Sequence, residues 1–224
     1  SILFACICTR PDIANATRDV CRYMHNPGMP HYRAARRILR YLKGTQDLGI
    51  TLGGSTNSIE RFAYSDSSYA PCIDTRRSVT GFVTYWNYGP VSWESRTQPT
   101  VSKSTAEAEY YALGEAISEM LWNRQIATDL HIPTLGPDTV FEDNQAAAAL
   151  AYNPRHKRRT KHIDVRWHFI RQYTKQGDIT VPYCPTSDMV AGILTKNLVK
   201  AKFMNLRPQL MGHKPHVAKV ALAA

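Results

Sequence analysis

The chain has 224 residues, of which 43% are hydrophobic, and it carries a formal net charge of +10 at pH 7. This length and composition allow one large domain, or one domain with an appendage, and exclude a disordered or fibrous protein. No apolar run approaches the roughly 20 residues that a membrane helix needs, so no membrane partner is expected. The positive charge favours a polyanionic partner, nucleic acid first. The five cysteines have no CxxC pairing, which predicts reduced thiols in an intracellular protein.

Residues 1–58 are predicted to form a helical segment. Helices are expected at 12–25 and 31–43, because Pro11 suits the first turn of the former and Gly44 suits the end of the latter. The second helix carries a row of basic side chains beside its apolar positions: Arg33, Arg36, Arg37, Arg40 and Lys43. This row either lies along a phosphate backbone or is a solvated helix face. A turn-rich run at 53–58 then predicts a boundary.

Residues 59–200 alternate between strand and helix patterns, which predicts one α/β domain. Strands are expected at 61–66, 78–86, 91–96, 139–143 and 178–183, and helices at 104–130, 144–151, 162–176 and 187–196. This order predicts a five-stranded mixed sheet flanked by helices, with the N-terminal helical segment as an appendage. Residues 201–224 are interpreted as a basic, poorly patterned C-terminal tail.

The long helix after residue 104 carries an acid on its apolar stripe. Ser104 and Glu107 have the spacing of a capping box, in which each side chain accepts a hydrogen bond from a backbone N–H group of the first turn. Glu109 lies three residues after Ala106 and four before Leu113, so it falls on the inward face. Burying a lone carboxylate is costly unless a cation meets it. Glu109 therefore either points into a cationic site or lies at the wet edge of a slightly rotated stripe.

Two further acids end strands. Asp66 closes the first predicted strand and Asp143 the fourth, so both can converge with Glu109 at one edge of the sheet. Three carboxylates repel one another unless cations hold them, and an oxygen-only cluster suits Mg²⁺ or Mn²⁺ better than zinc. Two such ions about 4 Å apart can activate a water and stabilise the leaving oxygen of a phosphodiester. The pattern suggests a metal-dependent nuclease, although strand-end aspartates are often plain turn residues.

Five blocks of sequence occur in a characteristic order: YSDSSYA, DTRRSVTGFVTYWNYGPVSWESRTQPTVSKSTAEAEYYAL, FEDNQAAAAL, RTKHIDVRWHFIRQ and PTSDMVAGILTK. Together they resemble the ribonuclease H domain of Ty1/copia-type retrotransposon polyproteins, and residues 9–50 resemble the segment that joins reverse transcriptase to it. The resemblance implies a ribonuclease H-like fold that hydrolyses the RNA strand of RNA–DNA hybrids with two Mg²⁺ ions. It also implies the reverse transcriptase portion of the same polyprotein as a partner, and a location in cytoplasmic virus-like particles or the nucleus.

Motif by motif, the resemblance assigns Asp66, Glu109 and Asp143 as catalytic metal ligands. The last family motif usually reads A-D-I-L-T-K, and its aspartate is the fourth metal-site acid; here Gly192 stands in its place. Asp188 lies four residues earlier on the predicted helix, where it either reaches the metals through a water or interacts with the helix dipole. Three hypotheses follow: an active ribonuclease H, an impaired or domesticated domain that binds hybrids without efficient cleavage, or a structural role. In the third, the N-terminal helices and this domain position a hybrid for a reverse transcriptase elsewhere in the polyprotein.

Nucleic-acid contacts are expected in two loops. Arg76 and Arg77, between the first two strands, are candidates for phosphate or 2′-hydroxyl contacts. A dense basic stretch after the fourth strand either carries the hybrid backbone past the acids or is a solvated loop. Its candidate residues are Arg155, Lys157, Arg158, Arg159, Lys161 and His162. His162 is either a mobile proton carrier near the metals or a structural histidine.

Overall fold

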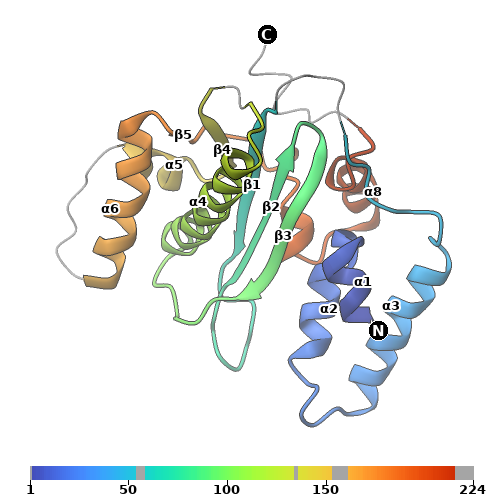
Figure 1. Ribbon diagram of the computed structural model, residues 1–224. Helices are drawn as coiled ribbons and strands as arrows, with labels where there is room; N and C mark the ends of the chain where they lie inside the picture. The colour runs from blue at the N-terminus through green and yellow to red at the C-terminus, as the bar shows by residue number, and fades with distance from the viewer. Residues whose placement is uncertain (1, 54–58, 134–135, 153–160, 215–224) are drawn as a thin grey trace.

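The computed structural model describes residues 2–53, 59–133, 136–152 and 161–214, with the side chains of residues 161–167 outside the description. A five-stranded sheet has helices on both faces, and further helices from the N-terminal segment lie beside it (Figure 1). The strand order is β3-β2-β1-β4-β5. The strands are β1 (Arg61–Ser68), β2 (Val79–Trp86), β3 (Gly89–Thr97), β4 (Asp138–Glu142) and β5 (Ile179–Thr180).

The sheet combines both kinds of strand pairing. β2 pairs antiparallel with β1 and with β3, whereas β4 pairs parallel with β1 and with β5. Parallel neighbours need long crossovers, which are supplied by α4 (Thr105–Asp129) before β4 and by α5 (Gln145–Tyr152) and α6 (Lys161–Gln176) before β5. Because β1 and β4 run in the same direction, their carboxyl ends reach the same edge of the sheet. The predicted five-stranded mixed sheet flanked by helices is confirmed.

Alternating side chains of β1 enter two cores, one on each face of the sheet. Phe62 stacks on Tyr85 with ring centroids 4.9 Å apart, and Tyr64 stacks on Phe141 at 4.8 Å. Ala63, between them in sequence, belongs instead to the core that β1 shares with α4. The buried faces of the sheet therefore hold β1 rigidly up to the residue at which Asp66 projects.

The N-terminal segment packs against the aromatic side of the sheet. It contains α1 (Ile2–Cys8), a 3₁₀ turn η1 (Pro11–Ile13), α2 (Ala14–Cys21) and α3 (Met29–Lys43). The helix expected at 12–25 is thus divided and shorter than predicted, and α1 was not predicted. Cys6, Ile13 and Ile38 are buried in the same core as the β1 aromatic residues. The predicted helical appendage is therefore present and shares a core with the sheet.

The segment after residue 200 differs from the expected unpatterned tail. Lys200–Leu210 form helix α8, whose Leu206 and Leu210 side chains are fully buried. The Thr51 N–H donates to the Met211 carbonyl at 2.8 Å, which fastens the end of this segment to the N-terminal part. Residues 200–214 consequently pack as part of the fold, while the proposed domain limits at 58 and 200 stay predictions.

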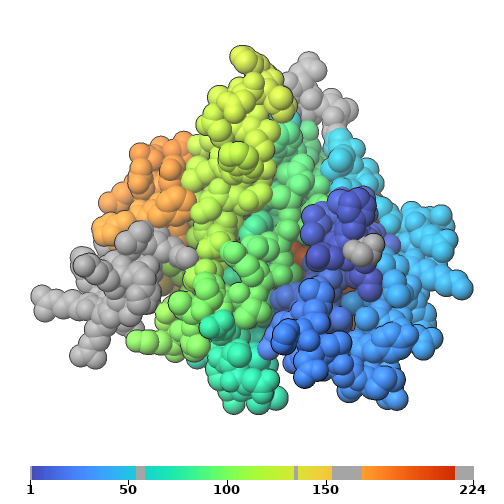
Figure 2. All heavy atoms as spheres, turned by 60° about the horizontal axis from the view of Figure 1, so that its bottom comes forward, coloured from blue at the N-terminus to red at the C-terminus, as the bar shows by residue number. Residues whose placement is uncertain are grey.

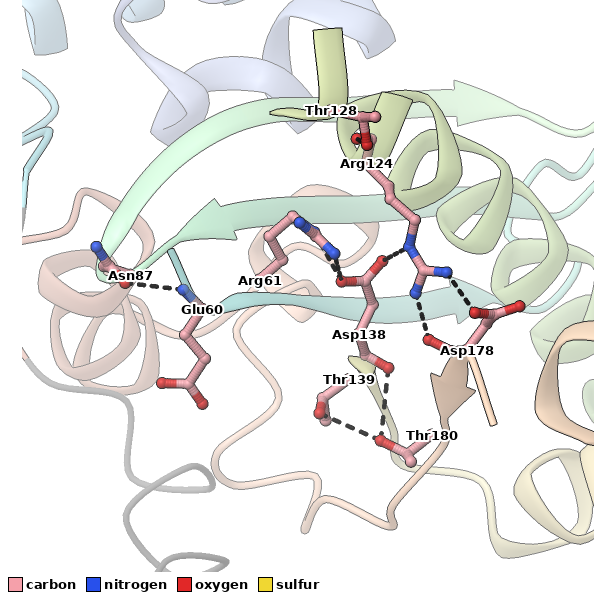
Figure 3. A network of polar contacts seen from close by, with 9 residues as sticks. All are labelled: Glu60, Arg61, Asn87, Arg124, Thr128, Asp138, Thr139, Asp178 and Thr180. Atoms are coloured by element: carbon pink, nitrogen blue, oxygen red, sulfur yellow. Dashed lines mark hydrogen bonds and ion pairs between the residues drawn. The ribbon is translucent and has the colours of Figure 1, made fainter. Parts of the chain in front are cut away.

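A buried ion network joins the beginnings of the parallel strands to the end of α4 (Figure 3). The carboxylate of Asp138 accepts from Arg61 Nε at 2.7 Å and from Arg124 Nε at 3.1 Å. Arg124 continues to Asp178, with 2.7 Å between Nη1 and the carboxylate. The Arg61 and Asp138 side chains are 2% and 1% exposed, so neither charge has water as an alternative partner. The network fixes β1, β4 and α4 relative to one another at the end of the sheet opposite to Asp66.

The short helix α7 (Gly192–Thr195) lies close against β2 at Gly81. A Cβ atom added to Gly81 would lie 2.5 Å from Thr195 Cγ2 and 2.8 Å from Leu194 Cβ, so only glycine permits this approach. Gly81 pairs with Asp66 in the β1–β2 register, which explains how Thr195 reaches Asp66. The prediction of a helix at 187–196 is wrong for residues 187–191, which lie in a turn region and not in a helix.

Gly81→Ala is expected to reduce the free energy of unfolding by about 1–3 kcal/mol, because the added methyl group overpacks the contact with α7. Gly192→Ala is the matched control: its added Cβ would meet nothing within 4 Å, and its backbone has a φ that alanine adopts freely. This variant should be neutral or more stable by up to about 1 kcal/mol. Urea unfolding of both variants measures the difference. Equal destabilisation would contradict the packing described for Gly81.

Candidate metal centre

The three acids singled out by the sequence converge. Asp66 near the end of β1, Glu109 one turn into α4 and Asp143 after β4 each offer a carboxylate oxygen, and these oxygens all lie within 4.8 Å of one another. Asp66 is fully buried and Glu109 is 7% exposed, whereas Asp143 is half-buried. Glu109 therefore points inward and does not lie at a wet helix edge. The predicted convergence is confirmed; the catalytic role of the acids stays a prediction.

Local sequence explains why α4 presents Glu109 at this point. The Ser104 hydroxyl accepts from the Glu107 N–H at 3.2 Å and fixes the first turn. The Glu107 carboxylate accepts from the Lys103 N–H at 2.9 Å, one residue before the position expected for a capping box. Glu107 is thus occupied in capping, and Glu109 is left as the acid that faces the sheet.

The electrostatics of the cluster favour a cation. Burial raises the pKa of Asp66, and the charge of Asp143 raises this pKa further. The charge of Lys196 lowers the same pKa. Burial, followed by the charges of Asp66 and Asp143, raises the pKa of Glu109 to about 9. Carboxylates that repel one another at this distance are held in their ionised form by a shared cation. An all-oxygen donor set of this spacing fits a hard divalent ion such as Mg²⁺ or Mn²⁺.

Two consecutive residues, the last of α7 and the one that follows it, engage Asp66. Lys196 Nζ donates to Asp66 Oδ1 at 2.7 Å, and the Thr195 hydroxyl donates to Oδ2. Thr195 is buried, and the Lys196 side chain is 36% exposed. Neither residue was predicted from the sequence, although both directly follow Gly192-Ile193-Leu194 in the last motif. Both oxygens of Asp66 are therefore held in place by side chains of this chain.

Glu142 is a further acid near the cluster, distinct from the family acid missing at position 192. It was not predicted from the sequence either. It is fully buried, and burial followed by the nearby Glu109 raises its pKa well above the usual range. Its Oε1 accepts from the Asn144 N–H at 3.1 Å, while Oε2 has no hydrogen-bond partner among the described residues. Strand alternation could have indicated it, because Glu142 shares the α4-facing side of β4 with Val140. Burial therefore favours the protonated form of the Glu142 carboxyl group.

Glu142→Gln is expected to change the free energy of unfolding by less than about 0.5 kcal/mol in EDTA, because glutamine has the shape of the protonated acid. Glu142→Ala is expected to cost about 1–3 kcal/mol, because it leaves the Asn144 N–H without its partner. Chemical unfolding at pH 7 compares the two. If glutamine destabilises as much as alanine, Glu142 is ionised in the folded protein.

The structure does not bring Asp188 into the carboxylate cluster. Asp188 lies in the turn before α7, so it does not share a helical face with Gly192 as expected. Its charge acts on the Tyr64 hydroxyl and the Cys184 thiol, whose pKa values burial raises first. Gly192 is buried, and a Cβ at this position would have open space around it. The position of the missing acid can therefore accept a side chain.

A cationic cavity lies beside the acids. It has a volume of about 390 Å³ and is lined by Arg77 of the β1–β2 loop, by Lys196, by Arg18 of α2 and by Arg22, which directly follows α2. Figure 2 shows α2 and the β1–β2 loop next to each other on this face. Arg18 and Arg22 were not predicted to line a site; Arg18 pairs with Asp19 at 2.6 Å, and Arg22 donates to Cys72 Sγ at 2.8 Å.

The other predicted nucleic-acid contacts are only partly described. Arg76 and Arg77 are both exposed in the β1–β2 loop, as expected for side chains that meet a large ligand. The candidates Arg155, Lys157, Arg158 and Arg159 lie outside the described residues, as do the side chains of Lys161 and His162. Their predicted roles therefore stay predictions.

No protein-family model matches the chain. The chain is 39% identical over 212 residues to the retrovirus-related Pol polyprotein from transposon TNT 1-94 of Nicotiana tabacum. The matched region covers 95% of the chain and 16% of the polyprotein. It is 38% identical over 197 residues to the Pol polyprotein from transposon RE2 of Arabidopsis thaliana, covering 88% of the chain and 14% of the polyprotein. The chain is homologous to one segment of the Pol polyproteins of Ty1/copia-type plant transposons. It spans about one sixth of the length of these curated relatives.

Among solved structures, LC11-RNase H1 isolated from compost is 15% identical, with a TM-score of 0.46, covering 61% of this chain and 92% of that one. The ribonuclease H-like fold of the copia-type segment follows from its own strand order, with three antiparallel strands joined by hairpins and two parallel strands added through helical crossovers. Within the described ranges, the helices are all too short or too polar to cross a membrane.

Proposed function

We propose that this segment is a metal-dependent endoribonuclease that hydrolyses the RNA strand of RNA–DNA hybrids during retrotransposon reverse transcription. The observation that carries the proposal is the convergence of Asp66, Glu109 and Asp143, whose carboxylate oxygens lie within 4.8 Å of one another. The homology to copia-type Pol polyproteins and the ribonuclease H-like fold support the same activity.

Asp66, Glu109 and Asp143 would hold Mg²⁺ or Mn²⁺. When bound, divalent ions at such a site supply an activated water nucleophile and stabilise the leaving oxygen of the phosphodiester. Thr195 and Lys196 orient the Asp66 carboxylate through its two oxygens. The cores beneath β1 and α4 hold Asp66 and Glu109 in a fixed relation, so the ligands need little reorganisation when a substrate binds.

The charge pattern suits a hybrid duplex. An acidic centre beside a cavity lined by Arg18, Arg22 and Arg77 provides positive surface for backbone phosphates and negative charge for the ions. Hybrid recognition would rest on phosphates and RNA 2′-hydroxyl groups, because a duplex of this kind is recognised mainly by shape and backbone. In the polyprotein, the reverse transcriptase portion would deliver the hybrid through the N-terminal helical segment.

Gly192 favours a second candidate function. It occupies the position of the family's fourth acid and offers no side-chain ligand, so the domain would bind hybrids without efficient turnover. The open space around its missing Cβ shows that nothing else fills the place of that acid within the described structure. In this case the basic surface and the fold are retained and the metal-dependent step is lost.

A substrate panel tests the proposal. The chain is incubated in Mg²⁺ or Mn²⁺ with labelled RNA–DNA hybrid, double-stranded RNA and double-stranded DNA, next to an EDTA control. We expect internal cuts in the RNA of the hybrid alone, and faster cutting by the Gly192→Asp variant. Salt-dependent hybrid binding without cleavage by the native chain, with cleavage restored in Gly192→Asp, would establish the second candidate instead. Cleavage of double-stranded DNA would contradict both.

A further inference from the structure

The cationic cavity beside the metal centre is enclosed by parts of the chain that are far apart in sequence. Arg18 and Arg22 come from the N-terminal segment, whereas Arg77 comes from the β1–β2 loop and Lys196 directly follows α7. The volume of about 390 Å³ lies within the usual range for ligand sites. Without the N-terminal segment the cavity would lose one of its walls and two of its cationic side chains.

Hydrogen bonds hold the N-terminal wall of the cavity in a fixed position. Arg18 Nη1 donates to Ser95 Oγ of β3 at 3.0 Å, and the Ser95 hydroxyl in turn donates to the Leu194 carbonyl of α7. Asn15 Nδ2 of α2 donates to Asn197 Oδ1 at 3.1 Å. The two walls are therefore joined before any ligand enters, and a ligand would not have to pay the cost of ordering them.

The side chains of the cavity carry more positive than negative charge. Four of them are cationic, and Asp19, the partner of Arg18 at 2.6 Å, is the acid among them. Arg22 donates to the thiol of Cys72, and within the described ranges neither Arg22 nor Arg77 forms an ion pair with a carboxylate. Arg18 Nε is buried and has no hydrogen-bond partner among the described residues. An anion in the cavity would balance this charge and offer acceptors to these donors.

The cavity directly borders the proposed metal ligands. Thr195 and Lys196 line it, and the same two side chains donate to the two oxygens of Asp66. A nucleic-acid strand with one phosphate at the metal centre would therefore place a neighbouring phosphate of the same strand at the cavity. Arginine suits this contact, because its planar guanidinium group donates two parallel hydrogen bonds to phosphate oxygens.

We propose that this cavity binds one backbone phosphate of the RNA strand, next to the phosphate held at the metal centre, and that the N-terminal segment supplies half of the site through Arg18 and Arg22. The choice of strand rests on the proposed function, in which the RNA strand lies at the metals. Phosphate binding itself needs no metal ion. The N-terminal segment is then part of the substrate-binding surface, in addition to being the link to the reverse transcriptase portion.

The test measures hybrid binding in EDTA, where cleavage does not interfere. Fluorescence anisotropy over a series of salt concentrations gives the dissociation constant for the native chain, Arg22→Gln, Arg77→Gln and the double variant Arg22→Gln/Arg77→Gln. Both arginines are exposed, so these proteins should stay folded, which thermal unfolding checks. Lys175→Gln is the control for the loss of charge, because Lys175 is an exposed lysine in the last turn of α6.

Two further hybrids identify the strand. In one, the linkages of the DNA strand are neutral methylphosphonates and the RNA strand keeps its charges. In the other, a 2′-O-methyl RNA strand has the neutral linkages and the DNA strand keeps its charges. Alkylation of Cys72 by iodoacetamide, read by mass spectrometry, reports whether the cavity is filled, because Cys72 lines it. The exposed Cys8 of α1 is the internal control.

We expect the double variant to bind the ordinary hybrid at least about tenfold more weakly than the native chain. The slope of log affinity against log salt should fall by about one unit, and Lys175→Gln should change neither quantity. The same loss is expected when the DNA strand is neutral, and no loss when the RNA strand is neutral. Hybrid should protect Cys72 and leave Cys8 labelled.

Equal weakening by Lys175→Gln would overturn the inference, because the effect would then be one of overall charge. A loss of affinity that persists when the RNA strand is neutral would also overturn it, as would protection of Cys72 by inorganic phosphate at equal ionic strength but not by hybrid. Absence of cleavage together with the expected affinities would remove only the proposed nuclease step. Cleavage of hybrids by a double variant that binds them as tightly as the native chain would overturn the phosphate site alone.

Discussion

Asp66→Asn is expected to lower the rate of metal-dependent hybrid cleavage by at least about 100-fold. Outer-shell changes at metal sites already cost roughly 10–100-fold, and Asp66 is placed as a direct ligand. Asparagine keeps the shape of the side chain and an oxygen that accepts from Thr195 or Lys196, so the protein should stay folded. The single-turnover rate at saturating Mg²⁺ is the quantity to compare.

Asp129→Asn provides the control for the same change of charge. Asp129 is exposed at the far end of α4, and it lies 20 residues beyond Glu109, about 30 Å along the helix. The Asp129→Asn protein should cleave hybrids at the native rate. An Asp66→Asn protein that is folded, binds hybrid and still cuts at the native rate would show that Asp66 does not hold a catalytic metal.

Asp138→Ala is expected to reduce the free energy of unfolding by about 3–5 kcal/mol, which is the usual cost of removing one partner from a buried ion pair. The Arg61 guanidinium, 2% exposed, would keep its charge in a place where water cannot replace the lost carboxylate. Arg124 would lose one of its two acidic partners at the same time. Urea unfolding followed by circular dichroism gives the difference in free energy.

Asp178→Ala tests the same network at its solvent side. The Asp178 side chain is 40% exposed, and its partner Arg124 is 25% exposed, so this pair is screened by water. Loss of this pair should reduce the free energy of unfolding by less than about 1 kcal/mol. If both substitutions have equal effects, burial does not determine the strength of this network, and the role given to Asp138 in holding β1, β4 and α4 together is wrong.

The sequence predicted the parts of the fold whose signals are local. Strand alternation in 61–66 and the Ser104 cap of α4 depend on neighbouring residues, and both appear in the structure close to the expected positions. Acids near strand ends and on an apolar stripe only suggested the convergence of Asp66, Glu109 and Asp143, and the family motifs then assigned the three residues. Short-range patterning was sufficient for the strand and the cap alone.

The missed features depend on contacts between distant parts of the chain. Lys196 meets Asp66 across 130 residues of sequence, and no local pattern indicates which acid a lysine in a short turn will reach. Helix α8 contains Pro208 and several basic residues, so its buried Leu206 and Leu210 did not stand out as an apolar stripe. Arg18 and Arg22 border the cavity only because the N-terminal segment shares a core with the sheet.

A Mg²⁺ titration of hybrid cleavage by the native chain and by Asp143→Asn is the most direct test of the proposed metal centre. Asp143 is the half-buried member of the cluster, so its substitution disturbs the core least. The result predicted here is a cleavage rate that rises with Mg²⁺ to saturation in the native chain and is lost in Asp143→Asn. A folded native chain that binds hybrid but does not cut it at any Mg²⁺ concentration, or an Asp143→Asn protein that cuts equally well, would contradict it.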